Sequence, residues 1–175
     1  MKPGVIRVGK RLVPTGSHEG KRIYIGADHR GYRLKETLKR ALRQRGWKVT
    51  DLGTYSPRRT DYPIPITRVA RAVGRTEGRK AVGIGICGSG IGASIPAAKV
   101  RGVHPALIRT VAMARETRSH NNTNFLSLPA SEISLKKALA VVTAWLREPF
   151  YSDPVRDAAY LRRYLQTAKL DDSRR

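Results

Sequence analysis

The strongest constraint on the fold is an unbroken apolar run at residues 81–86, with the sequence AVGIGI, which leads into Cys87 and a glycine-rich segment at 88–92. A continuous apolar run of this kind is typical of a central strand in a parallel sheet, where both faces of the strand are buried. We therefore expect residues 81–86 to lie in the middle of such a sheet.

Short apolar runs alternate with segments of helical periodicity along the rest of the chain. In one of these segments, Leu34, Leu38 and Leu42 recur at helical spacing, and Gly46 follows as a helix stop. This alternation predicts a single-domain, Rossmann-like α/β fold, with a parallel sheet of about five strands and helices on both faces. We expect strands at 23–26, 47–52, 81–86, 104–108 and 124–128, and helices at 31–45, 66–73, from the glycine-rich segment to 99, and at 111–119, 133–146 and 153–167.

A length of 175 residues suits one domain. Residues 1–20 are rich in Gly, Pro, Lys and Arg and lack a clear periodicity, so they are predicted to be an N-terminal extension. Residues 21–167 are expected to form the domain, and 168–175 a basic C-terminal tail. Residues 53–65 contain three prolines and are expected to form a loop.

Composition narrows the class of protein. The single cysteine excludes an intrachain disulfide and fits a reducing compartment. No apolar run approaches the roughly 20 residues of a membrane span, and residues 1–20 lack the apolar core of a secretory signal. We therefore expect a cytoplasmic protein without membrane association.

The net charge of +22, from 35 Lys and Arg against 13 Asp and Glu, is compatible with nucleic-acid binding or with a site for anionic substrates. The basic residues are scattered along the chain, and few aromatic residues stand between them. This arrangement argues against a dedicated nucleic-acid-binding protein.

Three polar clusters lie beside predicted strands. Asp28 and His29 follow the first strand, Cys87 and its glycines follow the third, and the segment 120–122 (His-Asn-Asn) precedes the fifth. Because ligands of open parallel sheets sit at the carboxyl ends of the strands, we expect these clusters to form one site.

Cys87 is the candidate nucleophile or base. Backbone N–H groups in a turn that opens a helix stabilise a thiolate or a developing oxyanion, and can also hold phosphate. The alternative is a buried structural cysteine. The spacing of Gly88, Gly90 and Gly92 is not the G-x-G-x-x-G dinucleotide pattern and lacks a P-loop lysine, so it is also compatible with a simple tight turn.

The other clusters have alternatives as well. Asp28 and His29 could bind a sugar hydroxyl or phosphate, or Asp28 could cap a helix. His120 and Asn121 could form an acid/base pair or a polar turn. The segment 59–63 could cover a ligand or form a proline turn. No spacing such as CxxC or HExxH is present, so metal catalysis is not expected.

Taken together and in this order, the clusters resemble ribose-5-phosphate isomerase type B and its relative, galactose-6-phosphate isomerase. The resemblance covers about residues 21–165. The segments that carry it are GADHRG at 26–31, LGT at 52–54, RTDYP at 59–63, ICGSGIG at 86–92, AAK at 97–99 and HNNTN at 120–124.

The resemblance implies interconversion of an aldose and a ketose phosphate through a cis-enediolate, without a metal or organic cofactor. By the same resemblance, Cys87 is the base, Ser89 assists it, and the N–H groups of 88–92 stabilise the enediolate oxygen. His120 would help to open the furanose ring, with Asp28 on the ring oxygen or a hydroxyl. The remaining substrate contacts implied are His29, Tyr62, Gly88, Gly90, Gly92, Asn121 and Arg156.

The family builds its site between two subunits, so a homodimer, or a dimer of dimers, is implied. The phosphate-binding arginines depart from the family pattern. Ser131 stands where relatives have an arginine, and Arg156 matches the first of a C-terminal arginine pair whose second member falls near Tyr160. Arg162 or Arg163 could substitute one turn later.

These departures leave alternatives open. The favoured function is isomerisation of ribose 5-phosphate to ribulose 5-phosphate. The alternatives are isomerisation of a hexose phosphate or of a non-phosphorylated sugar, and a non-catalytic ligand- or nucleic-acid-binding protein on the same fold.

Overall fold

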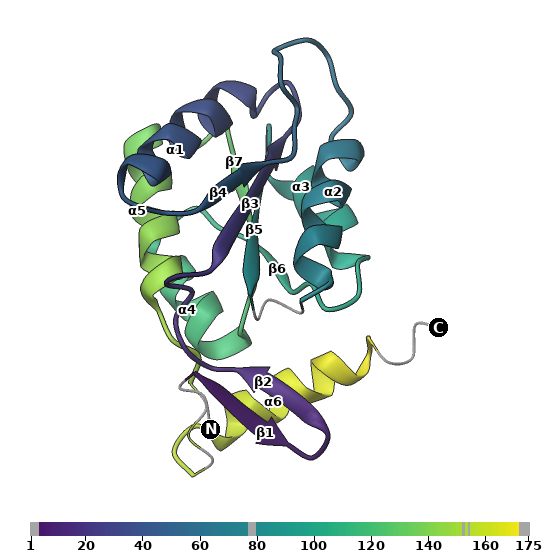
Figure 1. Ribbon diagram of the computed structural model, residues 1–175, viewed down its shortest axis with the longest axis vertical. Helices are drawn as coiled ribbons and strands as arrows, with labels where there is room; N and C mark the ends of the chain where they lie inside the picture. The colour runs from purple at the N-terminus through teal and green to yellow at the C-terminus, as the bar shows by residue number, and fades with distance from the viewer. Residues whose placement is uncertain (1–3, 77–79, 152, 154, 172–175) are drawn as a thin grey trace.

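Five parallel strands form the central sheet, in the order β4-β3-β5-β7-β6 (Figure 1). The computed structural model describes residues 4–76, 80–151, 153 and 155–171. The apolar run lies in the middle strand of the sheet and is buried throughout, as its composition predicted. The strands are β3 (Arg22–Ala27), β4 (Val49–Asp51), β5 (Ala81–Cys87), β6 (Pro105–Leu107) and β7 (Phe125–Pro129).

Helices cover both faces of the sheet, which confirms the predicted α/β class (Figure 1). Helices α1, α4 and α5 share one apolar core with the sheet, in which Leu38, Ala114 and Trp145 are buried. Helices α2 and α3 enclose a second core on the opposite face, around Phe125. The bounds are α1 (Tyr32–Gln44), α2 (Pro63–Gly74), α3 (Ile91–Ala98), α4 (Val111–Asn121) and α5 (Leu135–Arg147).

Two helices differ most from the sequence prediction. Helix α2 begins at Pro63 instead of residue 66, because proline is tolerated in the first turn of a helix, where its missing N–H would have no partner. The final helix, α6, spans Ala158–Lys169 instead of 153–167. Residue 154 of the predicted helix lies outside the described residues.

Residues 5–14 form a β-hairpin, where the sequence suggested only an extension. Strand β1 (Val5–Val8) pairs antiparallel with β2 (Arg11–Pro14). The hairpin packs with α6 at the amino end of the sheet (Figure 1), around a small separate core. Its buried members are Val13, Phe150, Tyr164 and Ala168.

The last residue of the hairpin and the segment that follows it are anchored to the C-terminal end of α4. The Asn122 amide donates a 2.9 Å hydrogen bond to the carbonyl oxygen of Pro14, and Arg118 donates to that of Gly16. Nε2 of His18 lies 3.0 Å from the carbonyl oxygen of Thr123. The hairpin is therefore attached to the turn that leads from α4 into β7.

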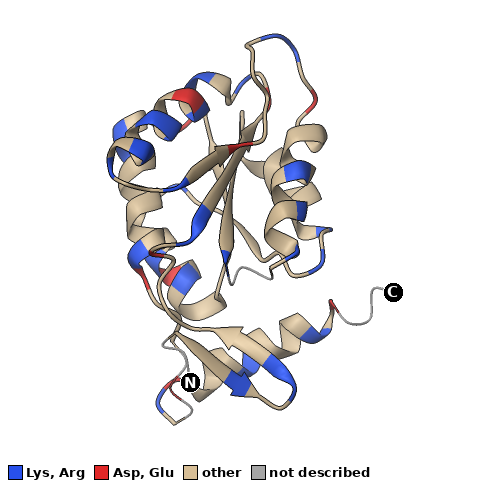
Figure 2. Cartoon of the chain, viewed as in Figure 1, with Lys and Arg blue, Asp and Glu red and all other residues tan. Residues whose placement is uncertain are grey.

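Basic residues are spread over the helices on both sides of the sheet and over the hairpin, rather than gathered in one band (Figure 2). Among the described residues, no helix combines the length and the apolar character that a bilayer crossing needs.

Candidate active site

The ends of β3 and β5 form the point where the strand order reverses, which is the usual ligand site of such sheets. Cys87 ends β5 and is 3% exposed. The N–H of Asp28 donates to the carbonyl oxygen of Ile86 at 3.2 Å, so Asp28 lies beside the last residues of β5. Its Oδ1 accepts a 2.8 Å hydrogen bond from the N–H of Gly31, the residue at the N-cap of α1. The cluster that contains Asp28 and the cluster that contains Cys87 therefore lie side by side, as predicted from the sequence.

The loop after Cys87 is fixed on both sides. Gly90 has a φ of 76°, a left-handed conformation that glycine adopts without strain, and this turn places it at the N-cap of α3. The carbonyl oxygens of Cys87 and Gly88 accept hydrogen bonds from the N–H groups of Ala130 and Ser131, at 2.9 and 3.0 Å. The Ser89 hydroxyl accepts one from the N–H of Ile91 at 3.3 Å. The loop that should hold an oxyanion is therefore ordered by its neighbours.

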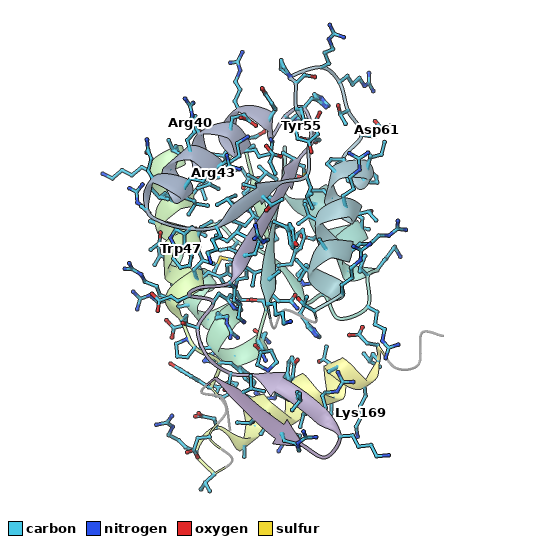
Figure 3. All side chains as sticks on the ribbon, in the orientation of Figure 1. Arg40, Arg43, Trp47, Tyr55, Asp61 and Lys169 are labelled. Carbon is cyan, nitrogen blue, oxygen red and sulfur yellow. The ribbon has the colours of Figure 1, made fainter. Side chains whose placement is uncertain are left out.

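The loop between β4 and α2 lies over the same edge; Figure 3 labels Tyr55 and Asp61 on it. A Cβ atom added to Gly92 would lie 3.2 Å from the Tyr62 ring, so the ring packs directly on the glycine loop. Nδ1 of His29 lies 3.1 Å from the carbonyl oxygen of Thr60. Tyr62 and His29 thus join Cys87, Asp28 and the glycines at the carboxyl edge.

Sequence reasoning missed Arg30 at this edge. Its guanidinium lies against the backbone of Gly88, where an added Cβ would be 2.5 Å from Cζ of Arg30. Its Nη2 donates a 3.0 Å hydrogen bond to the hydroxyl of Ser131. The only signal in the sequence was its position directly after His29.

His120 and Asn121 lie at the opposite edge of the sheet. They end α4, which leads into the amino end of β7, whereas Cys87 pairs with Pro129 at the carboxyl end of that strand. At about 3.3 Å per residue, β7 puts roughly 13 Å between the two edges. The prediction that all three clusters meet was wrong for a single chain, because residues that precede a strand lie at its amino end.

The surroundings of His120 are aromatic. Its ring stacks on Tyr160 with a centroid separation of 4.2 Å and an interplanar angle of 10°, and Tyr151 lies 5.5 Å away. A pocket of about 460 Å³ opens beside it, between the sheet and α6. Residues that line the pocket include His104, Thr117, His120, Asn121, Arg163 and Tyr164.

The three C-terminal arginines lie in three different surroundings. Arg156 is exposed, and its Nε lies 3.1 Å from Oδ1 of Asp157. Of its two suggested substitutes, Arg163 lines the pocket beside His120, whereas Arg162 lines a surface between α6 and the hairpin. Within one chain, none of the three reaches the edge that carries Cys87.

Comparisons with known proteins agree on one family. The family model described as ribose/galactose isomerase matches residues 23–161. The chain is 41% identical to ribose-5-phosphate isomerase B of Escherichia coli over 128 residues, which are 72% of this chain and 83% of that protein.

Solved structures give the same result. Ribose-5-phosphate isomerase B of Clostridium thermocellum superposes with a TM-score of 0.79 and 36% identity, covering 87% of this chain and 98% of that one. The Mycoplasma genitalium protein, solved with bound ribulose-5-phosphate, has a TM-score of 0.81 and 29% identity, covering 87% and 97%.

Proposed function

Because the chain belongs to the ribose/galactose isomerase family, as its motifs suggested, we propose that it is an aldose–ketose isomerase that converts ribose 5-phosphate to ribulose 5-phosphate. The observation that carries the proposal is the group formed by Cys87, the glycine loop, Asp28 and His29 at the junction of β3 and β5. Enolate chemistry needs a base and fixed donors where negative charge develops, and this edge offers both.

In the proposed reaction, the thiolate of Cys87 removes the proton from C2 of the open-chain aldose. The electron pair forms the C1–C2 double bond of a cis-enediolate, and the aldehyde oxygen becomes an alkoxide that the N–H groups of 88–92 stabilise. Return of the proton to C1, with transfer of the hydroxyl proton from the C2 oxygen to the C1 oxygen, gives the ketose. No electrons leave the sugar, so the reaction needs no redox partner. Ser89 assists Cys87 by hydrogen bonding, and Tyr62 contacts the sugar.

A second copy of the chain supplies the rest of the site in this proposal. His120 opens the furanose ring, Asn121 contacts the sugar and Arg156 binds the phosphate, while Asp28 of the first copy binds the ring oxygen or a hydroxyl. The support is geometric: a general acid or base must lie within about 3 Å of the atom it serves, and roughly 13 Å separates the two clusters in one chain. A homodimer with two shared sites satisfies both clusters, because a twofold axis makes each contribution reciprocal.

The single free thiol of Cys87 also supports a cytoplasmic setting, in which cysteines stay reduced. Ser131 stands where the family resemblance implies an arginine, and each lost arginine removes a charge-assisted contact to phosphate. The experiment that tests the proposal therefore includes sugars other than ribose 5-phosphate.

The test is turnover of the purified protein on ribose 5-phosphate, on a panel of hexose 6-phosphates and on free pentoses, beside the variant Cys87→Ala. We expect turnover of ribose 5-phosphate that falls by about 10²- to 10⁴-fold in the variant. Activity on another sugar alone would keep the mechanism and change the substrate. A fully active Cys87→Ala variant would reject Cys87 as the base, and inactivity on every sugar would reject catalysis.

A further inference from the structure

We propose that Arg30 binds the phosphate group of the substrate, in place of the arginine that this chain lacks at position 131. This inference rests on the proposed function, because it assigns a substrate contact within the same site. It begins from the position of the guanidinium, which lies on the backbone of Gly88, the residue next to the candidate base.

The geometry around Gly88 brings three segments together. The N–H of Ser131 holds the carbonyl oxygen of Gly88 at 3.0 Å, and the Ser131 hydroxyl accepts a 3.0 Å hydrogen bond from Arg30. Arg30 comes from the turn after β3, and Ser131 from the turn after β7. The head group of Arg30 therefore lies at Ser131, the position at which the family resemblance implies an arginine.

The charge of Arg30 is not neutralised within the described part of the chain. Its side-chain hydrogen-bond partner there is the neutral hydroxyl of Ser131. The carboxylate next to Ser131 is that of Glu132, which is engaged with Arg109 at 2.6 Å. Asp28 accepts a hydrogen bond from the N–H of Gly31. A guanidinium stays protonated and carries five N–H donors, so one bond to Ser131 leaves several for an anion.

A phosphate group fits these donors better than a sugar hydroxyl does. The guanidinium fork matches the spacing of two phosphate oxygens and forms charge-assisted hydrogen bonds with them. His29 immediately precedes Arg30 and, by the family resemblance, contacts the same phosphate. Gly88 contributes by having no Cβ, since any side chain there would displace the guanidinium.

The test compares Arg30→Ala with Arg40→Ala. Arg40 is an exposed arginine on α1 (Figure 3). Arg40→Ala therefore lowers the net charge by the same amount as Arg30→Ala. For Arg30→Ala we expect KM for ribose 5-phosphate to rise about tenfold or more, with kcat within about threefold of wild type. The inhibition constant of inorganic phosphate should rise in parallel, whereas Arg40→Ala should leave both constants unchanged. An unchanged KM and an unchanged phosphate inhibition constant in Arg30→Ala would overturn the proposal.

A second variant returns the arginine to the family position. The double variant Arg30→Ala/Ser131→Arg should recover phosphate inhibition relative to Arg30→Ala, because the head group returns to the same place from the other turn. Circular dichroism of each variant separates a lost contact from a lost fold.

Failure of this inference can be told apart from failure of the proposed function. If Arg30→Ala turns over ribose 5-phosphate with the wild-type KM, the phosphate contact of Arg30 is rejected and the proposed isomerase function is retained. If no sugar is turned over, calorimetric titration with inorganic phosphate still decides: binding to the wild type that Arg30→Ala loses supports the anion site, and equal or absent binding in both rejects it.

Discussion

The two edges of the sheet are built in different ways. At the carboxyl edge, Asp28 and His29 directly follow β3 and Cys87 ends β5, so the strands themselves position these residues. At the amino edge, the turn after His120 is held by residues about a hundred positions away, as in the contacts from Asn122 to Pro14 and from Arg118 to Gly16. Cys87 thus takes its position from the strand that it ends, whereas the surroundings of His120 depend on the N-terminal segment and on α6.

The largest expected effect tests whether the two edges act on one substrate. Cys87→Ala and His120→Ala should each lose about 10²- to 10⁴-fold in activity. A mixed dimer of the two variants, co-expressed with different affinity tags and purified through both, contains one site with both residues intact. We expect about half of the wild-type activity, since one of the two equivalent sites is restored.

The control is a doubly tagged dimer in which both copies carry Cys87→Ala, which should stay inactive. If the mixed dimer is as inactive as this control, the two edges do not share a site, and the proposed site between two copies of the chain is rejected.

A smaller effect concerns the stability of the amino edge. Phe150 is buried against the hairpin and α6, and Phe150→Ala should cost about 3–5 kcal/mol of unfolding free energy through lost burial and the cavity left behind. Val155→Ala is the matched control, because Val155 is 88% exposed and should change stability by less than about 0.5 kcal/mol. Urea unfolding measures both. Equal stabilities would mean that the hairpin core contributes little.

The smallest effect is a pH dependence. Burial, and then the charge of Arg118, lowers the pKa of Lys21 to about 7. Burial lowers the pKa of His18 well below 6.5, with the charges of Arg118 and Lys21 adding to it. Between pH 7 and 10.5 the unfolded chain keeps a proton on Lys21 that the folded chain releases, so the unfolding free energy rises with pH across this window. His18 has the same sign below pH 6.5, where acidification favours the unfolded chain.

One group contributes at most about 1.4 kcal/mol per pH unit, and the partial exposure of Lys21 reduces this. Chemical unfolding of the wild type and of Lys21→Met at pH 7, 8 and 9 measures the slope. The variant should have the flatter profile, and parallel profiles would show that Lys21 does not titrate in this range.

The sequence predicted the sheet and the carboxyl edge because both follow from local pattern. The run at 81–86, its glycine loop and the pair Asp28 and His29 are each specified by neighbouring residues. The hairpin was missed because its strands are four residues long and carry Arg7 and Arg11, which obscure an apolar alternation. Its partners lie far away in the sequence, on and before α6, and no local pattern encodes that contact.

Individual side chains were predictable only in part. Only its position after His29 separates Arg30 from the other 34 basic residues, because its contact depends on the turn after β7 that brings Ser131 to it. His120 was predicted to lie beside Cys87, and this was wrong for a single chain because His120 precedes a strand instead of following one.

The small core shared by the hairpin and α6 has a consequence for synthesis on the ribosome. Val13 is translated early, but its partners Phe150, Tyr164 and Ala168 emerge about 140 residues or more later. At roughly 5–20 residues per second, the hairpin waits on the order of ten to thirty seconds for them. During that interval the strands of the sheet can already pair, so the surroundings of His120 are completed last, when α6, which carries the ring stacked on His120, has left the exit tunnel.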